Sequence, residues 1–107
     1  FGATLNAKRL ELLAELLPVV ADPEASMNVR IGAGATFEGL AGSAALQALV
    51  PRLAELAAHD DARIRADACF YLGLSRNAAA RPALAVCVND ADAGVREIAA
   101  EALDELG

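Results

Sequence analysis

The sequence predicts an all-α solenoid, in which three stacked helix pairs share one hydrophobic core. Three observations lead to this prediction: an internal repeat, apolar residues at three-and-four spacing, and prolines that recur with the repeat. The repeat becomes visible when residues 91–104 are placed on residues 60–73. This shift superimposes Asp61 on Asp92, Ile64 and Arg65 on Val95 and Arg96, Ala68 on Ala99, and Leu72 on Leu103. Self-similarity at a fixed period of this length is the sequence signature of repeat architectures.

A third and more divergent copy starts at Val29. Its positions match those of the last copy when Val29, Ala33, Thr36, Phe37 and Leu40 are placed on Val95, Ala99, Ala102, Leu103 and Leu106. Pro18, Pro51 and Pro82 recur at nearly the same spacing, each in the first helix of a pair. The missing N–H of proline is tolerated there either near the helix start or at a kink. The sequence therefore predicts one domain with units at about residues 5–42, 43–75 and 77–107.

In the first unit we expect a helix over residues 5–20, followed by a helix that starts after Ser26 and ends at Gly42. The first of these carries an apolar stripe of Leu10, Leu13, Leu16, Leu17 and Val20. Pro18 should kink or end this helix. Ser26 is placed to cap the second helix, because its hydroxyl oxygen can accept a backbone N–H bond.

In the second unit we expect helices over residues 44–58 and 62–74, and in the third unit over 78–88 and 93–106. Ser43 and Asp61 are the expected N-caps of the second unit's two helices. The apolar stripe of each second helix is too small to form a core alone, so the units must stack, with polar residues covering the ends of the stack. The last helix carries acids that fit a solvated end cap: Glu97, Glu101, Asp104 and Glu105.

Composition argues against several classes of partner. The formal net charge is −6 and the chain has a single Lys, whereas nucleic-acid binding needs several cations on one face. No apolar run reaches the roughly 18–20 residues that cross a bilayer, and no secretory leader is present, so no membrane partner is expected. Cys69 and Cys87 lack C-x-x-C spacing and flanking His, which favours a reducing cytoplasm. The start at Phe1 without Met suggests a fragment of a longer chain or a processed one.

The pattern D-x-x-[IV]-R-x-x-A-x-x-x-L, preceded by a helix with Pro and Leu, resembles the HEAT-repeat family, in particular its short bacterial version first recognised in phycobilin lyases. The resemblance implies a right-handed superhelix whose second helices line a concave, protein-binding surface. It also implies that Arg30, Arg65 and Arg96 pair with turn aspartates of their own or the adjacent unit, here Asp61, Asp92 or Asp22. The first unit departs from the pattern, because Ser26 stands where the other copies have Asp.

Three further segments carry a narrower resemblance to the C-terminal part of bacterial proteins that join an N-terminal thioredoxin-like domain to HEAT repeats. They are L-L-P-V-V-A-D-P-E at residues 16–24, V-R-I-G-A-G-A at 29–35 and L-A-G-S-A-A-L-Q-A-L-V-P at 40–51. The resemblance implies an upstream thioredoxin-like domain. No thioredoxin motif lies within these 107 residues.

No catalytic, cofactor or metal site is predicted. Gly32 and Gly34 lack the preceding strand and following Lys of a phosphate loop, so we expect close helix packing there. His59 has no second His or Cys one helical turn away, which favours a solvated turn over a metal site. Cys69 and Cys87 align with positions expected to be inside, so packing is the expected role. A disulfide between them would need their Cα atoms within about 7 Å.

Arg63, Asp67 and Phe70 are the candidate partner-binding residues, because they lie off the apolar stripe of their helix. Phe70 aligns with Glu101 and Ala35, so its ring could face outward, where aromatic and Arg side chains are favoured binding anchors. The alternative is that Phe70 packs between repeats. The neighbouring arginines could form a patch for an acidic partner, although ion pairing with local aspartates is favoured.

These observations predict a protein–protein interaction or scaffolding module, not an enzyme, that binds a partner protein on its concave helical surface. One alternative is the accessory client-binding domain of a thioredoxin-like oxidoreductase. Another is a phycobilin-lyase-like subunit that handles a chromophore. The sequence does not specify the partner or the oligomeric state.

Overall fold

The computed structural model describes residues 2–107, which form helices joined by short turns. In chain order the elements are α1 (Gly2–Val20), α2 (Met27–Gly39), α3 (Ala44–Ala48), α4 (Val50–Leu56), α5 (Ala62–Leu74), the 3₁₀ helix η1 (Ala78–Ala80), α6 (Arg81–Cys87) and α7 (Ala93–Leu106). No strand occurs among the described residues.

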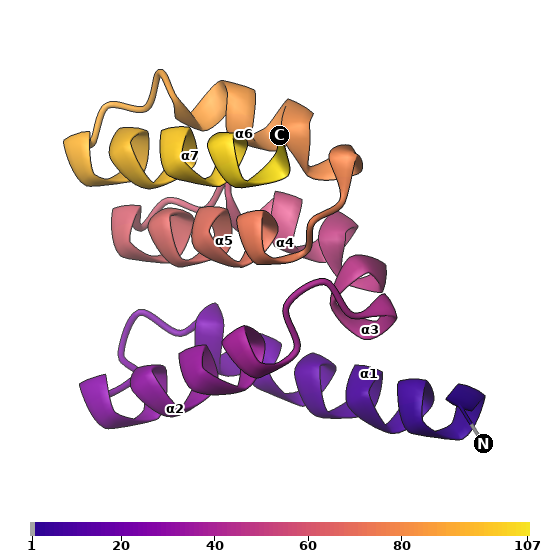
Figure 1. Ribbon diagram of the computed structural model, residues 1–107. Coiled ribbons are helices and arrows are strands. Elements are labelled where there is room, and N and C mark those ends of the chain that lie inside the picture. Colours follow the sequence, from indigo (N-terminus) through magenta and orange to yellow (C-terminus); the bar gives the residue numbers. More distant parts are fainter. Residues whose placement is uncertain (1) are drawn as a thin grey trace.

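The helices form two layers. Figure 1 shows α2, α5 and α7 stacked as one layer, while α1, the α3–α4 segment and α6 form the layer behind it. The molecule measures 44 × 32 × 18 Å, and its shortest dimension fits two layers of helices, each about 10 Å across. Three helix pairs therefore stack side by side, which confirms the predicted all-α solenoid.

Side-chain caps set the start of every helix in the α2–α5–α7 layer. The Ser26 hydroxyl accepts a hydrogen bond from the backbone N–H of Val29 at 3.3 Å, as predicted. The Asp61 carboxylate accepts from the N–H groups of Arg63 and Ile64 at 2.8 and 3.3 Å. Asp92 caps α7 in the same way. Each such cap stabilises its helix by about 1 kcal/mol, so short polar motifs position this layer.

The first helices of the second and third units differ from the prediction. The helix expected over residues 44–58 is divided at Leu49 into α3 and α4, and Pro51 lies in the first turn of α4. The helix expected over 78–88 begins as η1 and continues as α6, with Pro82 in the first turn of α6. Because proline lacks an N–H and its ring crowds the preceding turn, the chain restarts a helix at Pro51 and at Pro82, whereas α1 continues past Pro18 to Val20.

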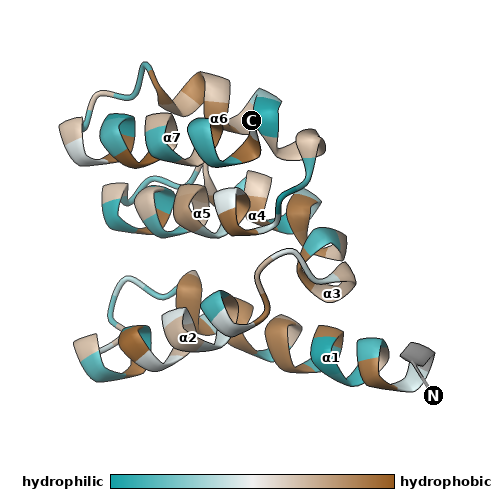
Figure 2. Cartoon of the chain, in the orientation of Figure 1, coloured by the Kyte–Doolittle hydropathy of each residue, from teal (hydrophilic) through white to brown (hydrophobic). Residues whose placement is uncertain are grey.

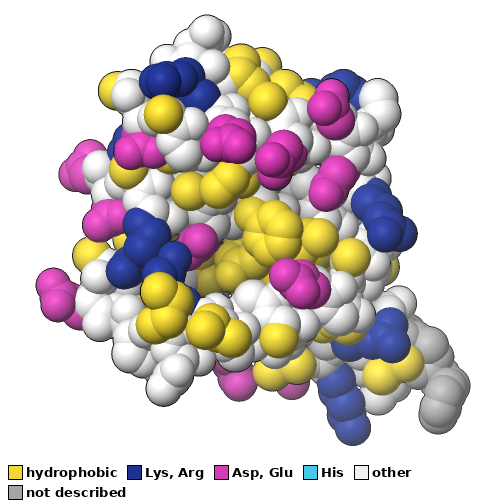
Figure 3. All heavy atoms as spheres, turned by 60° about the vertical axis from the view of Figure 1, so that its left-hand side comes forward, with side chains coloured by type: hydrophobic (Ala, Val, Ile, Leu, Met, Phe, Trp, Pro, Cys, Tyr) yellow, Lys and Arg dark blue, Asp and Glu magenta, His cyan; other side chains and the backbone are white. Residues whose placement is uncertain are grey.

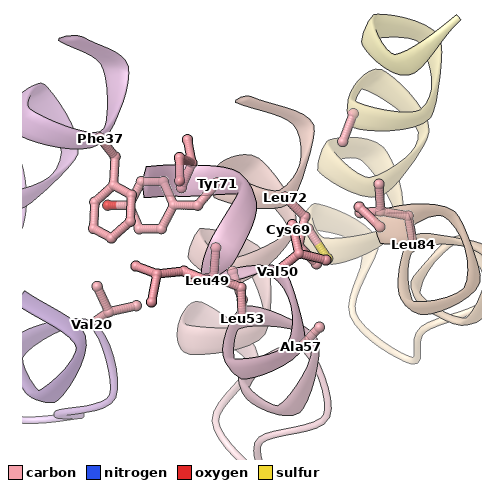
Figure 4. Packing of buried hydrophobic residues seen from close by; sticks show 14 of the residues in the cluster. Val20, Phe37, Leu49, Val50, Leu53, Ala57, Cys69, Tyr71, Leu72 and Leu84 are labelled. Atoms are coloured by element: carbon pink, nitrogen blue, oxygen red, sulfur yellow. The ribbon is translucent and has the colours of Figure 1, made fainter. Parts of the chain in front are cut away.

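One continuous core runs through all three pairs. Figure 2 shows hydrophobic and hydrophilic residues alternating along each helix, so every helix has an apolar side. The side chains on these sides meet between the layers, as Figure 4 shows for part of the cluster. Completely buried members from the three pairs include Leu13, Phe37, Leu46, Leu53, Leu72, Leu84 and Val95. Leu103, the repeat equivalent of Leu72, is only half buried, because no further helix among the described residues packs on the far side of α7.

The units meet through two different interfaces. Between α5 and α7, a Cβ atom built on Gly73 would lie 2.8 Å from the Cβ of Ala102, closer than side chains pack, so this approach requires glycine. Between α2 and α5, the rings of Phe37 and Tyr71 stack with centroids 4.1 Å apart and an interplanar angle of 11°. Figure 4 shows these two rings facing each other between their helices.

Candidate partner-binding site

Arg63, Asp67 and Phe70 lie on one side of α5, at spacings of four and three residues that place side chains on the same helix face. We call the surface formed by the outward sides of α2, α5 and α7 the second-helix face. Phe70 is 36% exposed, whereas Arg63 and Asp67 are partly buried. The structure therefore brings the three predicted residues together on this face.

Arg63 holds the turn between α1 and α2. Its Nη2 donates to the backbone carbonyls of Asp22 and Pro23 at 3.2 and 2.9 Å. The guanidinium thus satisfies two carbonyls at the entrance to α2 and ties the first unit to the second. A contribution of Arg63 to partner binding stays a prediction.

Asp67 makes the second connection between the same two units. Its carboxylate accepts from Arg30 Nη2 at 3.1 Å, with side chains that are 20% exposed for Arg30 and 28% for Asp67. Because the pair is partly exposed, solvent screens the attraction, and the pair serves to fix orientation more than to stabilise. The Asp67 carboxylate is already occupied within the chain.

Phe70 is the candidate residue whose side chain is partly exposed to solvent. One part of its ring packs on Tyr71, with centroids 5.7 Å apart and the planes tilted by 48°, while the rest faces solvent. Tyr71 in turn stacks on Phe37, so three aromatic side chains form a column from the core to the surface. The ring is thus partly exposed on the face, and its contact with Tyr71 lies within α5 and not between repeats.

Sequence reasoning missed Tyr71, because its repeat equivalents, Thr36 and Ala102, are not aromatic. Burial and the nearby Asp67 carboxylate raise the pKa of Tyr71 from 10.0 to about 12. Two consecutive aromatics in a chain with 4% aromatic residues were the available signal. The neutral phenol supports Phe70 from below and does not titrate near neutral pH.

Glutamates of α7 border the aromatic column. Glu97, Glu101 and Glu105 are exposed and follow each other every four residues, so they form one stripe along α7. Glu101 is the repeat equivalent of Phe70, and the Glu105 carboxylate reaches to 3.3 Å from the Cβ position of Gly73 on α5. Figure 3 shows acidic side chains in a row beside exposed apolar surface. The acids expected to cap the end of the stack therefore also border the second-helix face.

The arginines expected to join repeats have partners other than those predicted. Arg65 makes two parallel bonds to the Asp90 carboxylate, from Nε at 2.8 Å and Nη2 at 2.9 Å. Its Nη1 also donates to the carbonyls of His59 and Asp60, both at 2.9 Å. Such bidentate, charge-assisted bonds are strong and directional. Arg65 and the N–H of Asp92 hold the pKa of Asp90 below its usual value.

Arg96 and Arg30 also depart from the expected pairing. Arg96 Nη1 donates to the carbonyls of Asp90 and Ala91 at 2.7 and 3.1 Å, and Arg30 pairs with Asp67. Although Arg65 does bind a turn aspartate of the adjacent unit, Asp90, the predicted partners Asp61, Asp92 and Asp22 were wrong. Their carboxylates instead accept backbone N–H bonds in caps and turns, Asp61 and Asp92 as helix caps and Asp22 from the N–H of Glu24.

Cys69 and Cys87 are free, buried thiols, which confirms the packing role. Cys87 Sγ donates to the Ala57 carbonyl at 3.5 Å. Burial, followed by the neighbouring Cys87, raises the pKa of Cys69 far above its ordinary value. Because the thiolate is the reactive form, this environment makes Cys69 a weak nucleophile.

Two shallow hollows lie on the opposite layer. One of about 260 Å³ lies against α1 and α4 and is lined by Leu17, Pro18, Ala21, Arg52, Glu55 and Leu56. Another of about 300 Å³ separates α4 from α6 and includes Val86 and Cys87. Within residues 2–107 no group of three or more His, Cys, Asp or Glu side chains is placed to hold a metal ion. In the same range, no helix combines the length and the apolarity needed to cross a membrane.

The chain is an α-helical repeat protein of the solenoid class. Its stacked helix pairs share one core, its second helices have side-chain N-caps, and arginine side chains bind the carbonyls of its turns. A family model for HEAT repeats matches residues 49–107, more than half of the chain, and the chain belongs to this family. No curated protein and no solved structure matches it. HEAT repeats generally mediate protein–protein interactions and are typically non-catalytic scaffolds.

Proposed function

We propose that this chain is a scaffolding module that binds a partner protein on its second-helix face, with Phe70 as the anchor. The observation that carries the proposal is the 36% exposure of Phe70 at the middle helix of the stack. Aromatic side chains near the centre of a face contribute most to protein–protein affinity.

The support beneath Phe70 favours a binding role. Its ring lies on Tyr71, which is held by Phe37, so little side-chain freedom is left for a partner to remove. Binding to a rigid, preorganised group costs less conformational entropy than binding to a mobile one. Around the ring, Arg63, Asp67 and Glu101 supply the polar rim typical of such interfaces.

The alternative functions remain predictions. A client-binding role beside a thioredoxin-like domain would use the same face, and an upstream C-x-x-C in the full-length protein would favour it. A chromophore-handling role would be recognised by bilin absorbance after incubation with the pigment. No specific contact among residues 2–107 favours either of them over the scaffold.

The proposal is tested by comparing two exposed apolar positions. Phe70→Ala should abolish capture of the cellular partner, while Val86→Ala, on α6 and 74% exposed, should leave capture unchanged. Both variants should keep the circular-dichroism spectrum of the parent chain. Equal capture by the parent chain and the Phe70 variant would contradict the proposal.

A further inference from the structure

The charges around Phe70 deepen this proposed function, on which the following inference rests. We infer that the partner segment bound to the second-helix face is cationic and amphipathic. Its apolar side chain lies over Phe70, and its Lys or Arg side chains meet the glutamates of α7.

The glutamate stripe is the first argument. Glu97, Glu101 and Glu105 are exposed, and no Lys or Arg forms an ion pair or hydrogen bond with them within residues 2–107. A helix rises 1.5 Å per residue, so these carboxylates repeat every ~6 Å along α7. Three unneutralised carboxylates in a row produce a negative potential that attracts cations.

The cations of the same face are the second argument. Arg30 is paired with Asp67, and Arg63 donates to the carbonyls of the turn between α1 and α2. Arg30 is therefore neutralised by a carboxylate, whereas Arg63 donates only through Nη2 to carbonyls and keeps its positive charge, and its buried Nε has no partner in the described part of the chain. The three carboxylates of α7, unpaired within the described residues, outweigh this single charge, so the α7 side of the face is negative.

Exposed apolar side chains on α2 and α5, on the side of the face away from α7, are the third argument. Met27 and Ile31 are 64% and 61% exposed, one turn apart on α2, and Phe70 lies on the neighbouring helix. Figure 3 shows exposed apolar side chains below the acidic row. An acidic border beside apolar surface is complementary to a segment that has an apolar stripe beside a cationic one.

The carboxylate spacing fits such a segment in either regular conformation. Lys residues at i and i+4 of a helix repeat every ~6 Å, and residues at i and i+2 of a strand repeat every ~6.6 Å. Two 15-residue probe peptides of Lys and Leu, one with helical and one with alternating spacing, therefore test the inference. The same peptides with Glu in place of Lys serve as controls.

Tyrosine fluorescence provides a local readout. The chain has one Tyr and no Trp, and the Tyr71 ring contacts Phe70, so its emission reports on this face when the probes contain no aromatic residue. We expect saturable binding of at least one Lys/Leu probe, weakened by added salt, and no binding of the Glu controls. Phe70→Ala should lower the affinity.

Matched triple variants separate the face from net charge. Replacing Glu97, Glu101 and Glu105 by Gln should weaken probe binding about tenfold or more, as expected when close opposite charges are lost. Replacing Glu11, Glu15 and Glu55 by Gln changes the net charge equally but affects exposed positions of α1 and α4, and should leave affinity within about twofold. Thermal melts of both variants verify folding.

The outcomes distinguish the inference from the function on which it rests. Equal weakening by the two triple variants, or no binding by either Lys/Leu probe, would overturn the cationic partner. If Phe70→Ala still lost the cellular partner in those cases, the protein-binding function would stand. If neither probe nor cellular partner depended on Phe70, both proposals would fail.

Discussion

The two interfaces between units differ in how they hold helices together. At the α5–α7 interface the backbones approach closely, because Gly73 and Ala102 meet without larger side chains between them. At the α2–α5 interface, Figure 1 shows a wider separation, which the Phe37–Tyr71 stack fills and the Arg30–Asp67 pair bridges. Units with similar sequences thus pack by small residues, whereas the divergent first unit is attached by large ones. The same large side chains support the exposed ring of Phe70.

The largest effect is expected at the aromatic interface. Phe37→Ala removes a completely buried ring and the stacking partner of Tyr71. Truncating a buried Phe typically costs about 3–5 kcal/mol, so urea denaturation should show a loss of this size. A loss below about 1 kcal/mol would mean that the first unit does not depend on the stack.

Alkaline pH should weaken the same interface. The pKa of Tyr71 is raised from 10.0 to about 12, so the neutral phenol stabilises the fold fully below about pH 10. This contribution is lost as pH rises through 12, and a shift of this size corresponds to roughly 2–3 kcal/mol. Denaturation between pH 9 and 12 should show the loss, and Tyr71→Phe should reduce it. An identical pH dependence in Tyr71→Phe would rule out this origin.

Overpacking should disturb the small-residue interface. Gly73→Ala would place a methyl group 2.8 Å from the Cβ of Ala102 and 3.0 Å from its Cα. Extra methyl groups in close-packed regions cost about 1–3 kcal/mol. Gly32→Ala is the matched control, because a Cβ there meets nothing within 4 Å, and it should stabilise α2 by ~0.5–1 kcal/mol. Equal melting temperatures of the two variants would contradict the close approach.

The smallest effect is expected from the ion pair. A double-mutant cycle with Arg30→Ala and Asp67→Ala should give a coupling energy of about 0–1 kcal/mol, as for other partly exposed pairs. The coupling should decrease in 1 M salt. A salt-independent coupling above about 2 kcal/mol would show that the pair, and not the stack, holds the first unit.

The sequence was sufficient for features that depend on local patterns. The helix pairs and the caps at Ser26 and Asp61 were predictable, because apolar spacing and N-cap chemistry act over a few residues. The hydrogen-bond acceptors of Arg65 and Arg96 were not predictable. Whether a guanidinium reaches a carboxylate or a nearby backbone carbonyl depends on the path of the turn. The half-buried state of Leu103 follows from the absence of a further helix pair beside α7 among the described residues.

For the candidate site, the sequence identified Phe70 but not the Tyr71 and Phe37 rings that pack beneath it. The Phe37–Tyr71 stack joins residues from non-equivalent repeat positions, and repeat alignment cannot show how far one unit lies from the next. The role of the α7 glutamates was only partly predicted. Their solvation was expected, but their position beside Phe70 depends on how α5 and α7 align in the stack.

The most direct test of the binding face is a map of backbone amide shifts in the ¹⁵N-labelled chain during titration with the Lys/Leu probe that binds. We predict that the largest changes follow the outward sides of α5 and α7, around Phe70 and Glu101, and that they vanish in the Glu97/Glu101/Glu105→Gln variant. Changes concentrated on α1, α4 and α6, or spread evenly over the chain, would contradict a binding site on the second-helix face.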